Sequence, residues 1–167
     1  HSAFGRYGGH FGKVASQVSD ISAAVKLIKE FEGFKSQPYL CPAGIPTIGY
    51  GSTYYKDGRK VTLKDQPISE KDASALLEQI VTKDILPQAT RICPVLEKNN
   101  NALNAVIDFC YNMGVGKFKS STLAIMINAE DWPKAKEQLM RWVHSDGEVL
   151  PGLVRRRTAE AALLPEK

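Results

Sequence analysis

The sequence has little of what marks disulfide-stapled, metal-binding or membrane-spanning proteins. It contains three cysteines, Cys41, Cys93 and Cys110. Their odd number and irregular spacing do not indicate a disulfide framework, although a bridge between Cys93 and Cys110 stays open. Reduced thiols imply synthesis in a reducing cytoplasm. The histidines lie at no ligand spacing from the cysteines, so we expect no metal or cofactor. Apolar runs are too short for a signal peptide or a membrane-spanning helix.

Neither sign of charge is in large excess. Lys and Arg number 22 against 18 Asp and Glu, which gives a net charge of +4. This mild excess suits a polyanionic partner such as a bacterial cell wall. Nucleic acid is not expected, because the basic residues are scattered apart from one run at residues 155–157 and no nucleic-acid-binding module is recognisable. With 167 residues, 43% of them hydrophobic, the chain is long enough for one domain with a sizeable core, and we expect a monomer.

The first part of the chain differs from the rest. Residues 1–17 are rich in glycine with aromatic residues between the glycines, and we interpret them as a flexible leader or a cloning remnant. A native wall-binding or membrane-seeking arm is the alternative. Residues 18–167 are predicted to form the folded domain, and they contain no internal repeat.

The pattern of segments predicts an α+β protein that is mostly α. A first helix is expected to end at Glu32, before Gly33. Short extended segments follow, with a hairpin turn signal at residues 57–58. A capping sequence at residues 69–72 opens a long helix that continues to Pro87. Further helices are predicted near residues 101–113, 121–128, 131–143 and 152–164.

Two acidic residues near the end of the first helix differ in their surroundings. At about 100° per residue, Glu32 falls within the apolar arc of this helix, whereas Glu30 projects to the opposite side, where it can pair with Lys26. A carboxyl group on the core-facing side is desolvated, which favours its protonated form. Glu32 is therefore a candidate general acid. A structural ion pair with an arginine is the alternative role.

The stretch of residues 32–51 is a helix end followed by a loop rich in glycine and proline. It contains Glu32-Gly33, Cys41, Thr47 and Ile48-Gly49-Tyr50-Gly51. The cysteine follows the glutamate by nine residues, and the threonine comes six residues later. This stretch resembles the active site of the phage-type lysozymes, the endolysins of glycoside hydrolase family 24, in which an aspartate occupies the position of Cys41. The resemblance extends over residues 21–164 and includes motifs at residues 111–114 and 150–157.

The resemblance implies a two-lobed, lysozyme-like fold. A small lobe with a β-hairpin and a helical lobe would be joined by the long helix. The implied activity is that of a muramidase, which hydrolyses the β-1,4 bond between N-acetylmuramic acid and N-acetylglucosamine in peptidoglycan. Such a protein is made in the host bacterial cytoplasm and acts on the cell wall after release. In this reading Glu32 protonates the leaving oxygen, and Cys41 with Thr47 serves the attacking water.

Cysteine in place of aspartate changes the expected mechanism. Glycoside hydrolysis usually pairs the acid with a second carboxylate, yet the sequence has no Asp or Glu between Glu32 and Asp57. A thiolate at Cys41 is able to activate water or to attack the anomeric carbon itself. The hydroxyl of Thr47 is placed to hold the water. The alternative for Cys41 is a small buried apolar side chain.

The resemblance implies that four further residues line the sugar groove: Thr53, Tyr111, Thr122 and Gln138. Hydroxyl, amide and aromatic groups suit sugar binding, and a core or surface role is the alternative for each of them. An arginine from the run at residues 155–157 is expected to orient Glu32. The sequence leaves open which arginine it is, and a solvated face is the alternative for the run.

Three other functions stay open at this point. A lytic transglycosylase needs only one acid, so the missing carboxylate favours it, whereas Thr47 at lysozyme spacing argues against it. A catalytically inactive wall-binding module would result if Cys41 does not replace the aspartate. A cysteine protease with Cys41 and His144 has no supporting motif.

Overall fold

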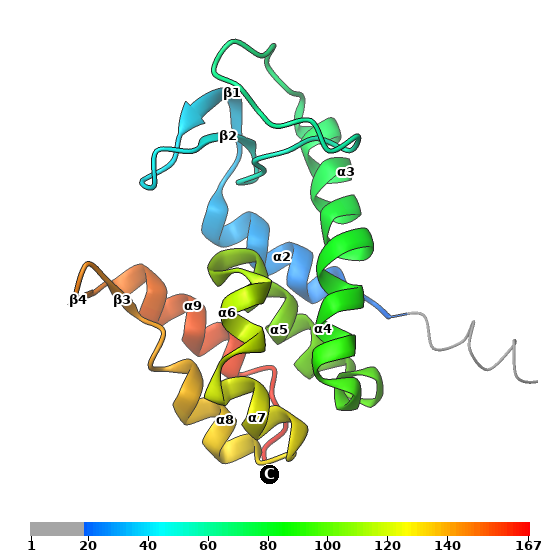
Figure 1. Ribbon diagram of the computed structural model, residues 1–167, viewed down its shortest axis with the longest axis vertical. Helices are drawn as coiled ribbons and strands as arrows, with labels where there is room; N and C mark the ends of the chain where they lie inside the picture. The colour runs from blue at the N-terminus through cyan, green and yellow to red at the C-terminus, as the bar shows by residue number, and fades with distance from the viewer. Residues whose placement is uncertain (1–18) are drawn as a thin grey trace, which may run out of the picture.

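The computed structural model describes residues 19–167, and the leader predicted at residues 1–17 lies outside this part. A small lobe with a β-hairpin lies above a larger helical lobe, and one long helical segment joins them (Figure 1). The first described helix, α2 (Ser22–Glu32), packs chiefly against α5 (Asn100–Met113) of the helical lobe. The predicted α+β, mostly helical, two-lobed fold is confirmed.

Helix α2 ends where the sequence predicts. Ala24 and Ile28 are fully buried on its core-facing side. Gly33 follows with a φ of 72°, and its N–H donates to the carbonyl of Lys29 at 3.0 Å. Glycine adopts a positive φ without the steric penalty that a side chain brings. The chain therefore leaves the helix directly after Glu32 and turns toward the hairpin.

The small lobe is built on the antiparallel strands β1 (Lys35–Leu40) and β2 (Pro46–Gly49). Tyr39 pairs with Thr47, so residues 41–45 form the tip of the hairpin. Isolated bridges continue the small lobe, and one of them joins Tyr54 to Lys60. It closes the turn predicted at residues 57–58, where Gly58 has a φ of 88°. The predicted hairpin turn is confirmed.

The connection between the lobes is one continuous helical segment of three parts: α3 (Glu70–Ile80), the π-helical η1 (Val81–Ile85) and α4 (Leu86–Ile92). Ser69 caps it by accepting from the N–H of Asp72 at 3.0 Å. Pro87, expected to mark its end, lies inside it, so that prediction was wrong. The π-helical turn shifts the register, and the N–H of Leu86 bonds to Val81 five residues earlier. A proline, which has no N–H, is accommodated directly after such a turn.

The helical lobe surrounds α5, which is buried along almost its whole length. Around it lie η2 (Pro94–Lys98), α6 (Val115–Lys119), α7 (Thr122–Asn128), α8 (Trp132–Leu139) and α9 (Pro151–Ala161). The helix predicted at residues 131–143 ends at Leu139, and a short hairpin of β3 (His144–Ser145) and β4 (Glu148–Val149) follows. Asp146 and Gly147 at its turn both have positive φ. Helix α8 therefore ends four residues before the predicted boundary at residue 143.

All three cysteines are free thiols. Cys93 and Cys110 lie in the core and are at most 3% exposed, whereas Cys41 is half-buried at the hairpin tip. Burial raises the pKa of Cys93 to about 11 and raises that of Cys110 further still. Over residues 19–167, no helix has the length and apolarity needed to cross a membrane.

Candidate active site

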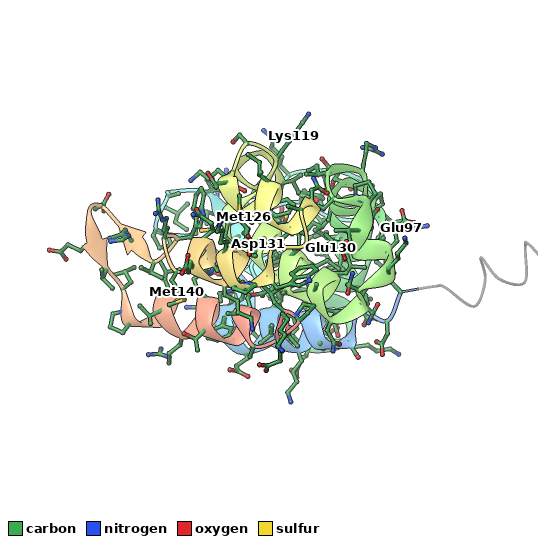
Figure 2. The ribbon with its side chains drawn as sticks, turned by 90° about the horizontal axis from the view of Figure 1, so that it is seen from below. Glu97, Lys119, Met126, Glu130, Asp131 and Met140 are labelled. Atoms are coloured by element: carbon green, nitrogen blue, oxygen red, sulfur yellow. The ribbon has the colours of Figure 1, made fainter. Side chains whose placement is uncertain are left out.

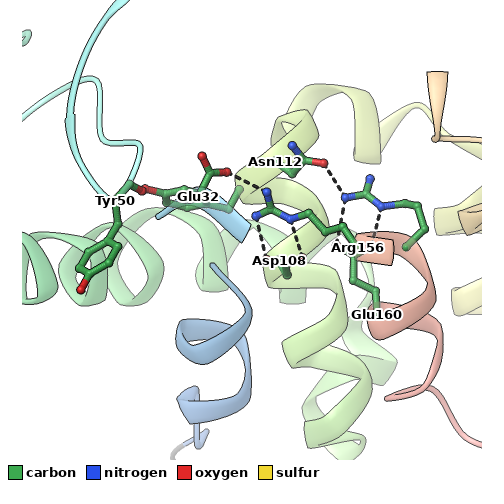
Figure 3. Close-up of polar contacts among 8 residues, drawn as sticks. Glu32, Tyr50, Asp108, Asn112, Arg156 and Glu160 are labelled. Carbon is green, nitrogen blue, oxygen red and sulfur yellow. Dashed lines mark hydrogen bonds and ion pairs between the residues drawn. The ribbon is translucent and has the colours of Figure 1, made fainter. Parts of the chain in front are cut away.

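Glu32 is the last residue of α2 and reaches toward the helical lobe. Its Oε2 accepts a hydrogen bond from Nη1 of Arg156 at 2.8 Å (Figure 3). The Glu32 side chain is 23% exposed and that of Arg156 is 5% exposed. The ion pair is thus largely screened from water but open on the side of the carboxylate. Arg156 is the arginine that the sequence left unassigned.

Asp108 fixes the other side of the same guanidinium. Its two oxygens accept from Nε and Nη2 of Arg156 at 3.0 and 2.9 Å, a bidentate geometry that restrains the plane of the group. Asp108 is fully buried on α5. One arginine thus shares its charge between two carboxylates, and Asp108 offsets the positive charge that Glu32 meets. Sequence reasoning missed Asp108, although a single acid in a strongly apolar helix was an available signal.

The other two arginines of the run have different surroundings. Arg157 is fully buried, where it forms an ion pair with Glu160 at 2.9 Å and donates to Asn112. Burial is the main factor that raises the pKa of Glu160 well above its usual range. Arg155 is exposed. The solvated face considered from the sequence is therefore wrong for Arg156 and Arg157.

Gly51 lies directly against the carboxylate. A Cβ built on this residue would meet Oε1 of Glu32 at 2.7 Å, closer than side-chain carbons approach such atoms. Gly51 also has a φ of 81°, which disfavours any residue with a side chain. The backbone of Gly51, the last residue of the Ile-Gly-Tyr-Gly run, therefore lies directly beside Oε1 of Glu32. Arg156 holds the other oxygen, Oε2.

Cys41 and Thr47 face each other near the tip of the hairpin. The pKa of Cys41 is lowered, chiefly by a hydrogen bond from the backbone N–H of Ile45. The lower pKa favours the thiolate. Thr47 is 3% exposed, and its hydroxyl donates to the carbonyl of Ile45 at 2.8 Å. Its oxygen is left to accept a hydrogen bond from another group. The pKa of Tyr39 is raised by burial and then by the charges of Glu32 and Cys41, so this ring lies within electrostatic reach of both.

Two of the predicted sugar-binding residues, Thr53 and Tyr111, line one pocket of about 340 Å³ that Gly51 also borders. Tyr111 donates from its hydroxyl to the backbone carbonyl of Tyr50, which ties the two lobes together. Thr53 comes from the small lobe, and Tyr111 comes from α5. The pocket therefore lies between the lobes, and Gly51, which lies against Glu32, forms part of its wall.

Three further polar residues line the same pocket and are hydrogen-bonded to one another: Tyr54, Asp84 and Gln88. Asp84 accepts from Tyr54 at 2.7 Å and from Gln88 at 2.6 Å. The other two sequence candidates are not among its lining residues. Thr122 is exposed at the start of α7, and Gln138 is half-buried on α8. The structure thus brings together the first pair of predicted groove residues and not the second.

A glutamate held by a buried arginine at the junction of a hairpin-bearing lobe and a helical lobe fits a lysozyme-like glycoside hydrolase. The chain belongs to the phage lysozyme family, whose sequence model matches residues 29–160. This confirms the resemblance seen in the sequence.

Similar proteins are endolysins. The endolysin of Bacillus phage B103 is 33% identical over 84% of this chain, which spans 52% of that relative's length. The endolysin of Acyrthosiphon pisum secondary endosymbiont phage 1 is also 33% identical, over 82% of this chain and 91% of the relative.

Solved structures agree. An endolysin from Escherichia coli O157:H7 phage FAHEc1 superimposes with a TM-score of 0.73 at 28% identity, over 86% of this chain and 91% of that one. The muramidase domain of SpmX from Asticaccaulis excentricus has a TM-score of 0.71 at 29% identity, over 90% of this chain and all of that one.

Proposed function

We propose that this protein is an endolysin that cleaves bacterial peptidoglycan as a muramidase, at the β-1,4 bond between N-acetylmuramic acid and N-acetylglucosamine. The observation that carries the proposal is the placement of Glu32. One of its oxygens is held by Arg156, and the other lies beside Gly51, which lines the pocket between the lobes. Relatives named as endolysins and a structural neighbour named as a muramidase support the same activity.

In the proposed reaction, Glu32 is the general acid. Arg156 holds Oε2, which leaves Oε1 beside Gly51 to carry the transferred proton. As the bond between the anomeric carbon and the glycosidic oxygen breaks, its electron pair passes to that oxygen, which takes the proton of Glu32. Such proton transfer typically contributes about 10² to 10⁴ to the rate.

Cys41 and Thr47 act on the water. The lowered pKa of Cys41 supplies a thiolate that removes a proton from water as the new carbon–oxygen bond forms. Thr47 accepts a hydrogen bond from the same water, because its own proton is committed to Ile45. Each cleavage consumes one water, releases a reducing end, and leaves the proton of that water on Cys41 for return to Glu32.

The products of wall digestion test this proposal. Purified peptidoglycan is digested, and the masses of the soluble muropeptides are measured by mass spectrometry. We expect reducing-end muramic acid. Products lighter by one water, with a 1,6-anhydro ring, would instead make the protein a lytic transglycosylase, and a protein that binds walls but releases nothing would be a binding module.

The variant Glu32→Gln tests the role of the acid in the same assay. Glutamine keeps the shape of the side chain but has no proton to give, so lysis should fall by about 10² to 10⁴. The circular dichroism spectrum should be unchanged. Lysis by Glu32→Gln at the wild-type rate would disprove the assignment of the acid.

A further inference from the structure

The pocket between the lobes, with a volume of about 340 Å³, carries a single charged side chain. Among the described residues that line it, Asp84 is acidic and none is basic. Asp84 forms no ion pair with another residue in the range 19–167. Its carboxylate accepts from two neutral groups instead, the hydroxyl of Tyr54 at 2.7 Å and the amide of Gln88 at 2.6 Å. The pocket therefore holds a negative charge that no neighbouring cation offsets.

The polar side chains around this carboxylate have committed their protons. Tyr54 donates to Asp84, and Tyr111 donates to the backbone carbonyl of Tyr50. Nε2 of Gln88 donates both to the carboxylate and to the backbone carbonyl of Asp84. Each of these three side chains has only an oxygen left to offer, and that oxygen can only accept a hydrogen bond. The pocket thus suits a ligand that is rich in hydrogen-bond donors.

Ser52 adds independent evidence that a ligand belongs in this pocket. It lines the pocket and is 2% exposed, and its Oγ has no hydrogen-bond partner within residues 19–167. A buried hydroxyl without a partner lowers stability, so native proteins rarely keep one without a reason. The hydroxyl of Tyr111 lies near Ser52, but its proton is committed to Tyr50. Oγ of Ser52 therefore keeps a lone pair for a donor on the ligand.

We propose that this pocket holds the ammonium group of a de-N-acetylated amino sugar, so that peptidoglycan whose glucosamine has lost its acetyl group is a preferred substrate. The inference rests on the proposed muramidase function. An ammonium group brings a positive charge and three N–H donors to Asp84, Ser52 and the oxygens beside them. An acetamido group brings one N–H and a carbonyl oxygen, which would face acceptors only at Tyr54, Tyr111 and Gln88.

The first experiment compares glycan strands that differ only in acetylation. The peptide stems are removed beforehand, so that no amine of a stem contributes. One sample is de-N-acetylated by a glucosamine deacetylase, one stays acetylated, and one is deacetylated and then re-acetylated with acetic anhydride. At a mildly acid pH, at which the sugar amine is protonated, kcat/KM of the wild type should be roughly two- to five-fold higher on the deacetylated strands. Re-acetylation should remove the difference, and an equal or lower kcat/KM on deacetylated strands would overturn the proposal.

Two variants assign this preference to the pocket. Asp84→Asn removes the charge and adds N–H donors, so the ratio of kcat/KM on deacetylated to acetylated strands should fall to about one or below. Asp146→Asn is the control, at an exposed turn of the β3–β4 hairpin, which projects from the helical lobe (Figure 2). Both variants raise the net charge from +4 to +5, yet Asp146→Asn should keep the wild-type ratio. A preference that survives Asp84→Asn, or is lost in Asp146→Asn, would overturn the assignment of the pocket.

Binding of the glucosamine trisaccharide tests the pocket separately from cleavage. In NMR titrations it should shift the amide signals of Ser52 and Thr53, and it should bind more tightly than the N-acetylglucosamine trisaccharide. Ser52→Ala, which leaves the charge of the pocket in place, should weaken this binding. Unshifted signals, or tighter binding of the acetylated trisaccharide, would overturn the inference. Tighter binding of the glucosamine form by a protein that cleaves no strand would support the pocket and disprove the proposed muramidase function.

Discussion

Nη1 of Arg156 donates to Oε2 of Glu32 at 2.8 Å, although the two residues are 124 positions apart in the chain. The same guanidinium is clamped by Asp108, so three helices, α2, α5 and α9, meet at one arginine. The orientation of the proposed acid therefore depends on how the helical lobe packs around the end of α2.

Asp108→Asn should reduce lysis. The two carboxylate oxygens of Asp108 clamp the guanidinium of Arg156, and asparagine keeps only one acceptor oxygen, so Arg156 no longer holds Glu32 in one fixed orientation. Rates of lysis measured on purified walls check this.

The same variant should also be less stable, because it breaks a buried ion pair, a change that typically costs about 3 to 5 kcal/mol. Denaturant unfolding measures this loss. Asp72→Asn, at an exposed position in the first turn of α3, is the control. It should leave lysis unchanged and should lower stability by at most about 1 kcal/mol, through the charge lost at the helix N-terminus. If Asp108→Asn lowers stability but leaves the rate of lysis unchanged, Asp108 has a structural role only.

Gly51→Ala should reduce lysis far more than it reduces stability. Its Cβ would meet Oε1 of Glu32 at 2.7 Å, which displaces the carboxylate from its position between Arg156 and the pocket. Gly58→Ala is a matched control, because Gly58 also has a positive φ but nothing lies within 4 Å of its added Cβ.

Both alanine variants should lose about 1 to 2 kcal/mol of unfolding free energy from backbone strain. Only Gly51→Ala should lose activity, which turbidity assays on walls measure. Equal activity in the two variants would show that the approach of Gly51 to Glu32 does not matter for catalysis.

Cys41 should be the first thiol to react with iodoacetamide. Its pKa is lowered and it is half-buried, whereas Cys93 and Cys110 are buried with raised pKa values. Peptide mass mapping after brief alkylation near neutral pH should find the label on Cys41 together with loss of lysis. Prior labelling of either core thiol would contradict the assignment.

Substitutions separate the roles of this thiol. Cys41→Ala should cripple the enzyme, whereas Cys41→Asp should keep substantial activity, because a carboxylate is able to do the same work on water. A glycosyl-thiol adduct, detected by mass spectrometry, would show that Cys41 is the nucleophile. Full activity of Cys41→Ala would leave Glu32 and Thr47 as the whole catalytic apparatus.

The loop around Asp65 should loosen in acid. Hydrogen bonds, first from the backbone N–H of Thr62, lower the pKa of Asp65 to about 2 from 3.8. A carboxylate with a depressed pKa adds stability that is complete above the ordinary value and is lost as the pH falls toward the depressed one. The amide signal of Thr62 in NMR spectra should therefore shift between about pH 4 and pH 2. Asp65→Asn should abolish this step, and a step that persists in the variant would belong to another group.

Local features of the site followed from the sequence alone. The apolar arc of the first helix predicts which of two glutamates faces the core, and the glycine after it predicts where α2 ends. Both follow from the local sequence, because helical periodicity and a positive φ depend on neighbouring residues. The spacing from Glu32 to Cys41 and Thr47 carried the family resemblance. Their catalytic roles, like those of Thr122 and Gln138 in sugar binding, stay predictions.

The tertiary structure decided what depends on packing between distant segments. No local pattern distinguishes Arg156 from Arg155 and Arg157, because which of them is buried is set by the docking of α9 against α2 and α5. The clamp by Asp108 arises in the same way. Pro87 lies inside a helix for a related reason. The π-helical turn before it compensates for the missing N–H. That turn is held by packing between the lobes, and the free energy of this packing cannot be read from the local sequence.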